Sequence, residues 1–221
     1  MRTKALFGLA ALAVGLSTSV AQNVYSLNVV GYVNVSLQAN KLSFLSVPLV
    51  PSGGNFNITN SIALSDAQDG ASLYAWTGTG WNNNAPSWLA GFGWFPDMVI
   101  SNGVGFFIAS KAASTLTFVG DVPQGALAYN IPAGLSTLGN QVPVTGNFPG
   151  ASVGHDGDSI YTWVQLSQSW NPNSASYIGG FGWFSSDATV TTNGPVLNPA
   201  DGAFYVNTGA AIPFTQNFTV Q

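Results

Sequence analysis

The 221-residue sequence contains no cysteine and no glutamate, and it has one histidine and only four Lys and Arg residues. Without cysteine no disulfide can form, and a single histidine cannot supply the usual ligand sets of structural zinc or redox metals. So few basic residues also argue against nucleic acid or an anionic membrane as a partner, because both attract Lys and Arg. We therefore expect stability to come from burial, and we predict no cofactor.

The N-terminus has the order of a secretory signal. Arg2 and Lys4 precede an apolar run over residues 5–16, and small residues occupy 19–21. This order predicts a signal peptide over residues 1–21, cleaved before Gln22. The run is shorter than the roughly 20 residues that span a bilayer, and no second run follows. We expect a mature chain of net charge −6 that is secreted or at the cell surface and is not inserted in the membrane.

A repeated pentapeptide organises the rest of the chain. Gly-Phe-Gly-Trp-Phe occurs at 91–95 and again at 180–184. Flanking segments match in the same order: 69–76 with 156–163, 81–82 with 170–171, and 105–107 with 202–204. This preserved order predicts a tandem duplication, with one repeat over 22–124 and a second over 125–221. The second copy carries an insertion at 195–201.

The apolar pattern is that of strands. Short runs rich in Val, Ile, Phe and Tyr, such as 29–35, alternate with polar residues and end at Gly, Pro or Asn. Only residues 55–68 lack strict alternation, and there we expect a short helical turn. The prediction is an all-β fold of two tandem repeats that form pseudo-symmetric, sandwich-like or barrel-like units.

Several of these segments resemble a known group of proteins. Val-Val-Gly-Tyr-Val at 29–33, Gly-Phe-Phe-Ile at 105–108 and the stretch 118–125 are similar to an uncharacterised family of exported, internally duplicated proteins of Verrucomicrobia and related bacteria. The resemblance covers nearly the whole mature chain and implies export, but it assigns no function and no site. Val104 and Asp201 depart from the family, in which Glu would precede the glycine.

Aromatic residues supply the candidate binding site. Four tryptophans fall between residues 76 and 94, and aromatic residues recur at the corresponding places of the second copy. They fit core packing, and they also fit a sugar-binding face on which flat rings stack against pyranose rings. Exposed rings would favour sugar binding, and buried rings would favour a structural role. The candidate carbohydrate-binding residues lie in or near turn-rich loops: Trp81, Asn82, Trp88, Trp170, Asn171 and Tyr177.

The sequence offers little for catalysis or metal binding. Residues 157–160 resemble the nucleophile block of GDS-type serine hydrolases, and His155 is near, but that family has its histidine close to the C-terminus. Asp97 and Asp187 are related by the duplication, which indicates the same structural task in two places. Asp156 and Asp158 could offer calcium two carboxylates, without the remaining ligands of a calcium loop. We predict no catalytic and no metal residues.

The function predicted from sequence is a non-enzymatic structural protein of the extracellular space or cell surface, which associates with itself or with the envelope. Low charge leaves little repulsion between copies, and strands with few lysines leave their edges open to pairing. A carbohydrate-binding module is the main alternative, and a secreted hydrolase is a remote one.

Overall fold

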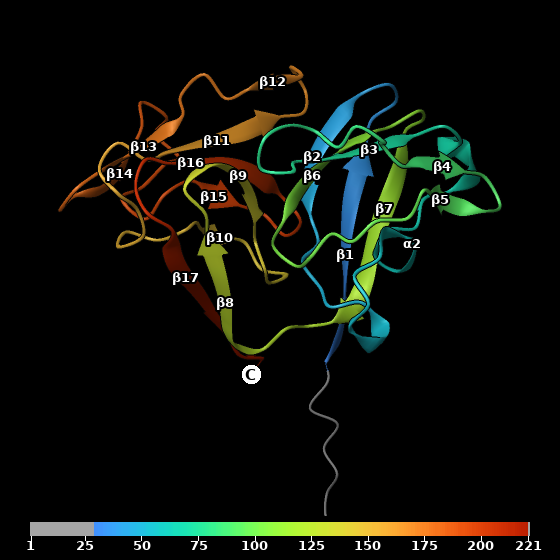
Figure 1. The fold of residues 1–221 in the computed structure, drawn as a ribbon, viewed down its shortest axis with the longest axis horizontal. Coiled ribbons are helices and arrows are strands. Elements are labelled where there is room, and N and C mark those ends of the chain that lie inside the picture. The colour runs from blue at the N-terminus through green and yellow to red at the C-terminus, as the bar shows by residue number, and fades with distance from the viewer. Residues whose placement is uncertain (1–28, 221) are drawn as a thin grey trace, which may run out of the picture.

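The computed structural model describes residues 29–220, whose regular secondary structure is almost entirely strand (Figure 1). The first part of the chain holds β1 (Val30–Leu37), β2 (Leu42–Ser46), β3 (Ser72–Ala75), β4 (Ser87–Leu89), β5 (Gly93–Phe95), β6 (Gly105–Ala109) and β7 (Ser114–Asp121). Three short helical turns, η1 (Ser52–Gly54), α2 (Ile58–Ser61) and η2 (Asp66–Gln68), lie between β2 and β3. The predicted all-β class is confirmed. Of these turns, α2 and η2 lie in the expected region 55–68, whereas η1 precedes it.

The second part holds β8 (Gly125–Ile131), β9 (Gly134–Gly139), β10 (Gly146–Asn147), β11 (Ser159–Val164), β12 (Ser169–Trp170), β13 (Ala175–Ile178), β14 (Gly182–Phe184), β15 (Val196–Leu197), β16 (Gly202–Asn207) and β17 (Ile212–Phe218). We call residues 30–121 the first unit and residues 125–218 the second unit.

Each unit is a small sandwich of a main sheet and a two-stranded ribbon. The main sheets have the orders β2-β6-β3-β4-β5 and β9-β16-β11-β13-β14, and the ribbons are β1-β7 and β8-β17. None of these sheets, within residues 29–220, closes on itself. The core of the first unit lies between the layers, where Leu37 and Phe118 of the ribbon face Leu73, Phe106 and Ile108 of the sheet. Alternation explains this arrangement, since every second strand residue points to the same face.

The two main sheets also share their register. Leu73 pairs with Ile108 in the first unit, as Ile160 pairs with Tyr205 in the second. In the outer hairpins, Trp88 pairs with Trp94 as Tyr177 pairs with Trp183. Corresponding positions of the aligned sequence segments therefore occupy corresponding positions of the sheets. The duplication itself stays a prediction about the origin of the chain.

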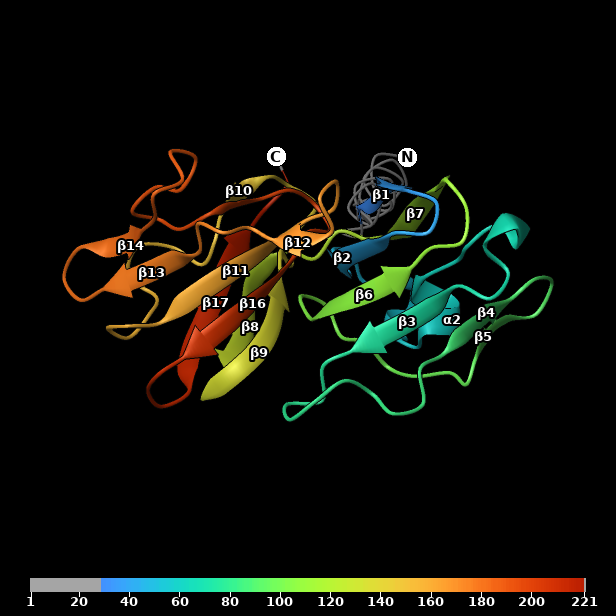
Figure 2. The same ribbon diagram turned by 90° about the horizontal axis from the view of Figure 1, so that it is seen from above.

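The two units contact one another reciprocally along β2, β6, β9 and β16 (Figure 2). Trp76 Nε1 donates to the Leu135 carbonyl oxygen at 3.0 Å, and Trp163 Nε1, at the corresponding place, donates to the Leu42 carbonyl oxygen at 3.1 Å. Since Leu42 and Leu135 also correspond, each unit gives the other the contact that it receives. Such reciprocal contacts indicate an approximate two-fold relation between the units.

The insertion at 195–201 ties the units together. Ala200 is fully buried and belongs to the apolar core of the first unit, although it lies in the chain of the second. Its carbonyl oxygen accepts a hydrogen bond from Ser46 N at 2.8 Å, and Ser46 Oγ donates to the Asp201 carbonyl oxygen at 3.0 Å. The insertion therefore packs as part of the interface between the units.

Candidate functional site

Three phenylalanines form the floor of a groove where the two main sheets meet. Phe44 of β2 stacks on Phe107 of β6, with ring centroids 4.4 Å apart, and on Phe204 of β16 at 5.3 Å. Their side chains are 5–6% exposed, and they form an apolar cluster separate from the cores of the two units. The cluster arises because Phe107 and Phe204 alternate with core residues on their strands and so face outward from each sandwich.

Two pairs of tryptophans cover this floor. Trp76 and Trp81 face one another across the 77–80 turn of the first unit, with centroids 5.6 Å apart. Trp163 and Trp170 do the same in the second unit at 5.0 Å. Trp81 and Trp170 each contact both Phe107 and Phe204, at centroid distances between 5.1 and 5.9 Å. The rings of both units thus converge on one shared surface, which we call the aromatic groove.

The aromatic groove contains two hollows of about 380 and 590 Å³. Trp81 and Trp170 line both of them. The smaller hollow is completed by Trp76, Leu135, Tyr161 and Phe204. The larger is completed by Leu42, Tyr74, Asn82, Asn83, Phe107, Ala109 and Trp163. Their volumes fall in the range of small-molecule sites, which are mostly apolar with a few polar groups.

Two tyrosine hydroxyl groups and two indole N–H groups at the hollows are neutral and free to bind. Among residues 29–220, no hydrogen bond holds the hydroxyl groups of Tyr74 and Tyr161 or the indole N–H groups of Trp81 and Trp170, and none of these is a buried atom without a partner. No charged side chain lines either hollow. The groove therefore offers ring faces and a few donors, and it has no charge that would select an ion.

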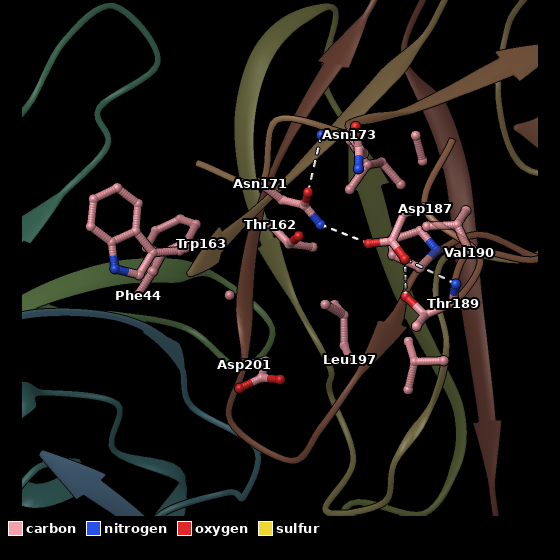
Figure 3. A pocket seen from close by; sticks show the side chains of 15 residues that line it. Phe44, Thr162, Trp163, Asn171, Asn173, Asp187, Thr189, Val190, Leu197 and Asp201 are labelled. Atoms are coloured by element: carbon pink, nitrogen blue, oxygen red, sulfur yellow. Dashed lines mark hydrogen bonds between the residues drawn. The ribbon is translucent and has the colours of Figure 1, made fainter. Parts of the chain in front are cut away.

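A separate polar pocket of about 200 Å³ opens in the second unit behind Trp163 (Figure 3). Asp187 accepts hydrogen bonds from Asn171 Nδ2 at 3.0 Å and from Thr189 N and Oγ1 at 2.9 and 2.7 Å. Those bonds, first of all the one from the Thr189 backbone, hold the pKa of Asp187 below its ordinary value. Asp201 lies on another wall, where burial raises the pKa of its carboxyl group.

Two carboxyl groups with pKa values shifted in opposite directions line this pocket, and they do not form a metal centre. In the part of the chain that the structure describes, no three His, Asp, Glu or Cys side chains gather as a metal site would need. Both carboxylates are already held by neighbouring amide or hydroxyl donors, Asp201 by Asn198 N and Nδ2. The pocket is therefore a small hydrogen-bonding cavity adjoining the aromatic groove through Trp163.

The structure brings together four of the six predicted site residues. Trp81, which is 37% exposed, and Trp170 form the centre of the aromatic groove. Asn82 lines the larger hollow, and Asn171 lines the polar pocket next to it. The amide groups of both asparagines are hydrogen-bonded to the protein, Asn82 through Ala75 N and Asn171 through Asn173 N and Asp187. They position the loops after the tryptophans.

The other two predicted residues lie elsewhere. Trp88 is 9% exposed, belongs to the core of the first unit and packs edge-to-face on Trp94. Tyr177 packs in the same way on Trp183 in the outer hairpin of the second unit, and its hydroxyl group donates to the Ala151 carbonyl oxygen. Neither residue lines the aromatic groove, so these two rings have the structural role that was the alternative for the aromatic set.

Sequence reasoning missed most of the groove. Trp76, Trp163, Tyr74 and Tyr161 were not among the predicted site residues, although all four line a hollow. The signal was present in the alternation of residues 72–76 and of β11, where Tyr and Trp fall on the face opposite the buried Leu73 and Ile160. An aromatic face on the side of a strand that turns away from its own core indicates a second packing surface.

The residues considered for catalysis have structural partners. His155 Nδ1 lies 3.0 Å from Asn207 Oδ1, and among residues 29–220 no hydrogen bond joins His155 to Ser159. Asp158 is fully buried and accepts from Tyr205 Oη at 2.7 Å, and from Thr208 N and the His155 backbone. Asp156 accepts from Gly179 N at the base of the outer hairpin. The hydrolase alternative needs a serine, a histidine and an acid in one cleft. His155 Nδ1 lies 3.8 Å from Asp158 Oδ2, but the hydrogen bonds that these two side chains make with other side chains go to Asn207 and to Tyr205 and Thr208.

Comparison with known proteins gives no family. No protein-family model matches the chain, and no curated protein matches it significantly. The resemblance to the exported family therefore stays a prediction, as does the signal peptide over 1–21, which lies outside the described residues. Within those residues, no helix has the length and apolar character needed to cross a membrane.

Proposed function

We propose that the protein is a non-enzymatic, exported binding protein that holds a neutral glycan in the aromatic groove. The observation that carries the proposal is the pair of hollows around Trp81 and Trp170, walled by partly exposed rings and free of charged side chains. The C–H faces of a pyranose ring are apolar and stack well on an indole face, while its hydroxyl groups can bond the free Tyr and Trp donors.

The lack of charge favours this class over others. A charged ligand would lose its hydration in the groove without gaining an ionic partner, which makes its transfer costly. A purely apolar ligand would leave any tyrosine hydroxyl or indole N–H group that it covers without a partner. A neutral polyhydroxylated ring satisfies both conditions. Binding through ring faces without a charged contact is expected to be modest in affinity for each ring.

Retention on insoluble polysaccharides tests the proposal. The chain from Gln22 to Gln221 is incubated with cellulose, chitin, xylan and mannan, and we expect retention on at least one. Trp81→Ala and Trp170→Ala should each weaken it by about tenfold, the equivalent of about 1.4 kcal/mol. Tyr32→Ala is the matched control, because Tyr32 is an aromatic residue of β1 that is 73% exposed and lies outside the groove. Failure of the wild-type chain to bind any of the four, or equal loss with Tyr32→Ala, would contradict the proposal.

Self-association is a second candidate, and the outer hairpins favour it. The repeated pentapeptide forms the tips of β4-β5 and β13-β14, which lie at opposite ends of the molecule (Figures 1 and 2). At these tips Phe92 and Phe95 are 90% and 71% exposed, and Phe181 and Phe184 are 71% and 50% exposed. Each molecule thus carries the same apolar tip at both ends, and contact between tips of successive molecules would extend into a chain.

Light scattering over micromolar concentrations tests this second candidate. We expect the mass of the mature chain to rise with concentration, and Phe92→Ser with Phe181→Ser should abolish the rise. Tyr32→Ser is the control, since Tyr32 is 73% exposed on β1 and away from both tips. A constant mass of about 21 kDa, that of the chain without residues 1–21, would exclude self-association.

A further inference from the structure

The two hollows of the aromatic groove correspond to one another. Exchange of the two units replaces each residue of one hollow by a residue of the other: Trp76 by Trp163, Leu135 by Leu42, Tyr161 by Tyr74, and Phe204 by Phe107. Trp81 and Trp170 are exchanged with each other, and both belong to both hollows. The hollows therefore adjoin at a shared pair of rings and follow the reciprocal relation that the Trp76 and Trp163 hydrogen bonds define.

We propose that the two hollows form one continuous site, which holds a single glycan chain across the two-fold relation and accepts it in either direction. This inference rests on the proposed function, and it goes further by specifying the length and the orientation of the ligand. A ligand that fills one hollow already touches Trp81 and Trp170, and these two rings also border the second hollow, so a longer chain reaches the second hollow by passing them.

The direction follows from the symmetry. A linear glycan has two different ends, and a two-fold rotation reverses its direction while leaving the site nearly unchanged. Both hollows present the same set of one Phe, one Leu, one Tyr and one Trp beside the shared rings. Stacking on ring faces depends little on the direction of the chain. The larger hollow differs by its greater volume and by Asn82, Asn83 and Ala109, which line it alone, beside the shared set of rings.

Ligand length provides the first test. The probe is the soluble oligosaccharide series, from disaccharide to octasaccharide, of whichever polysaccharide retains the protein, and binding is followed by tryptophan fluorescence and calorimetry. We expect two short oligomers but only one long oligomer per protein chain. The long oligomer should bind about a hundredfold more tightly, because its second half binds at a high effective concentration. Two long oligomers per chain with the affinity of short ones would overturn the inference while leaving the proposed function intact.

Matched variants provide the second test. Tyr74→Phe and Tyr161→Phe each remove one free hydroxyl group, from the larger and the smaller hollow, and keep the ring. For the long oligomer we expect losses of affinity that agree within about threefold, and a double variant whose loss is the product of the two. A loss confined to one variant would overturn the inference, because the ligand would then occupy one hollow only.

Orientation provides the third test. Each hollow contains residues that the other lacks, such as Leu135 in the smaller and Leu42 in the larger. A photoreactive diazirine attached to the reducing end of the long oligomer, at one oligomer per chain, should crosslink to residues of both hollows, which mass spectrometry identifies. Crosslinks to residues of only one hollow would show a single direction and overturn that part of the inference. If no oligomer of the series binds, the inference and the proposed function fail together.

Discussion

Asn82 and Asn171 follow the two central tryptophans of the aromatic groove at corresponding places, yet they face different surroundings. The amide of Asn82 is directed to the carbonyl oxygens of Leu73 and Asn84 and contacts Met98 Sδ at 3.9 Å. The amide of Asn171 donates to Asp187 and lines an open polar pocket. The space next to the asparagine is thus filled by the Met98 side chain in the first unit, whereas it is an open pocket in the second.

The residues after the corresponding aspartates account for part of this difference. Asp97 is followed by the half-buried Met98, whereas Asp187 is followed by Ala188. The insertion at 195–201, which only the second unit contains, supplies another wall of the pocket. A shared strand order therefore fixes where a cavity can form, and the size of single side chains decides whether it stays open.

The largest expected effect concerns a feature that the two units share, a buried tryptophan in the outer hairpin. Trp94→Ala and Trp183→Ala each remove an indole that is at most 3% exposed and that donates to a carbonyl oxygen, of Ile62 or Gly150. Each substitution should lower the free energy of unfolding by about 3–5 kcal/mol. We expect a single transition in urea, measured by circular dichroism, because Ala200 of the second unit is buried in the first. Two transitions, of which each variant shifts only one, would contradict a joint unfolding of the units.

A smaller expected effect is a pH dependence of stability that only the second unit contributes. Asp158 of the second unit is fully buried, whereas Ala71 occupies the corresponding place in the first. Although burial raises the pKa of Asp158, hydrogen bonds from the His155 and Thr208 backbone and from the side chains of Tyr205 and Thr208 outweigh it and lower the pKa below 3.8.

The sign of the pH dependence follows from this lowered pKa. The carboxylate stabilises the fold fully above the ordinary pKa, and this contribution is lost as the pH falls through the lower value of the folded state. Asp158→Asn should cost about 2–3 kcal/mol at neutral pH and flatten the decline of stability below about pH 4. Urea titrations at several pH values measure both. An unchanged acid profile in Asp158→Asn would show that other groups dominate it.

The smallest expected effect concerns the filled counterpart of the polar pocket in the first unit. Met98→Ala should open beneath Asn82 a cavity like that beneath Asn171, at a cost of about 1–2 kcal/mol, because Met98 is only half buried. The side-chain amide signals of Asn82 in the NMR spectrum should shift, while those of Asn171 serve as the internal control. Unshifted signals of Asn82 would mean that Met98 does not close the site in the first unit.

The sequence alone predicted the all-β class of the fold, but it pointed to only part of the aromatic groove. The period of two over 29–35 predicted a strand, and the structure has β1 there. The lack of alternation over 55–68 predicted a helical turn, and α2 and η2 form there. Of the candidate rings, Trp81 is exposed and Trp170 is half-buried in the groove, whereas Trp88 lies in the core, because the same tryptophan-rich pattern serves both core and surface. The sequence could not predict the stacking of Phe44 on Phe204 or the hydrogen bond from Trp163 to Leu42, since both depend on how the second unit packs on the first.

The sequence by itself determined the class and the internal order of this protein. Alternation and turn residues dictate strands locally, and the low content of charge and cysteine dictates stability by burial. Only the tertiary structure decided which outward face of each sheet meets the other. That choice places four tryptophans and three phenylalanines from distant segments in one groove. The physical reason is that strand periodicity specifies which side a residue faces, whereas the partner on that side is set by packing between segments remote in the chain.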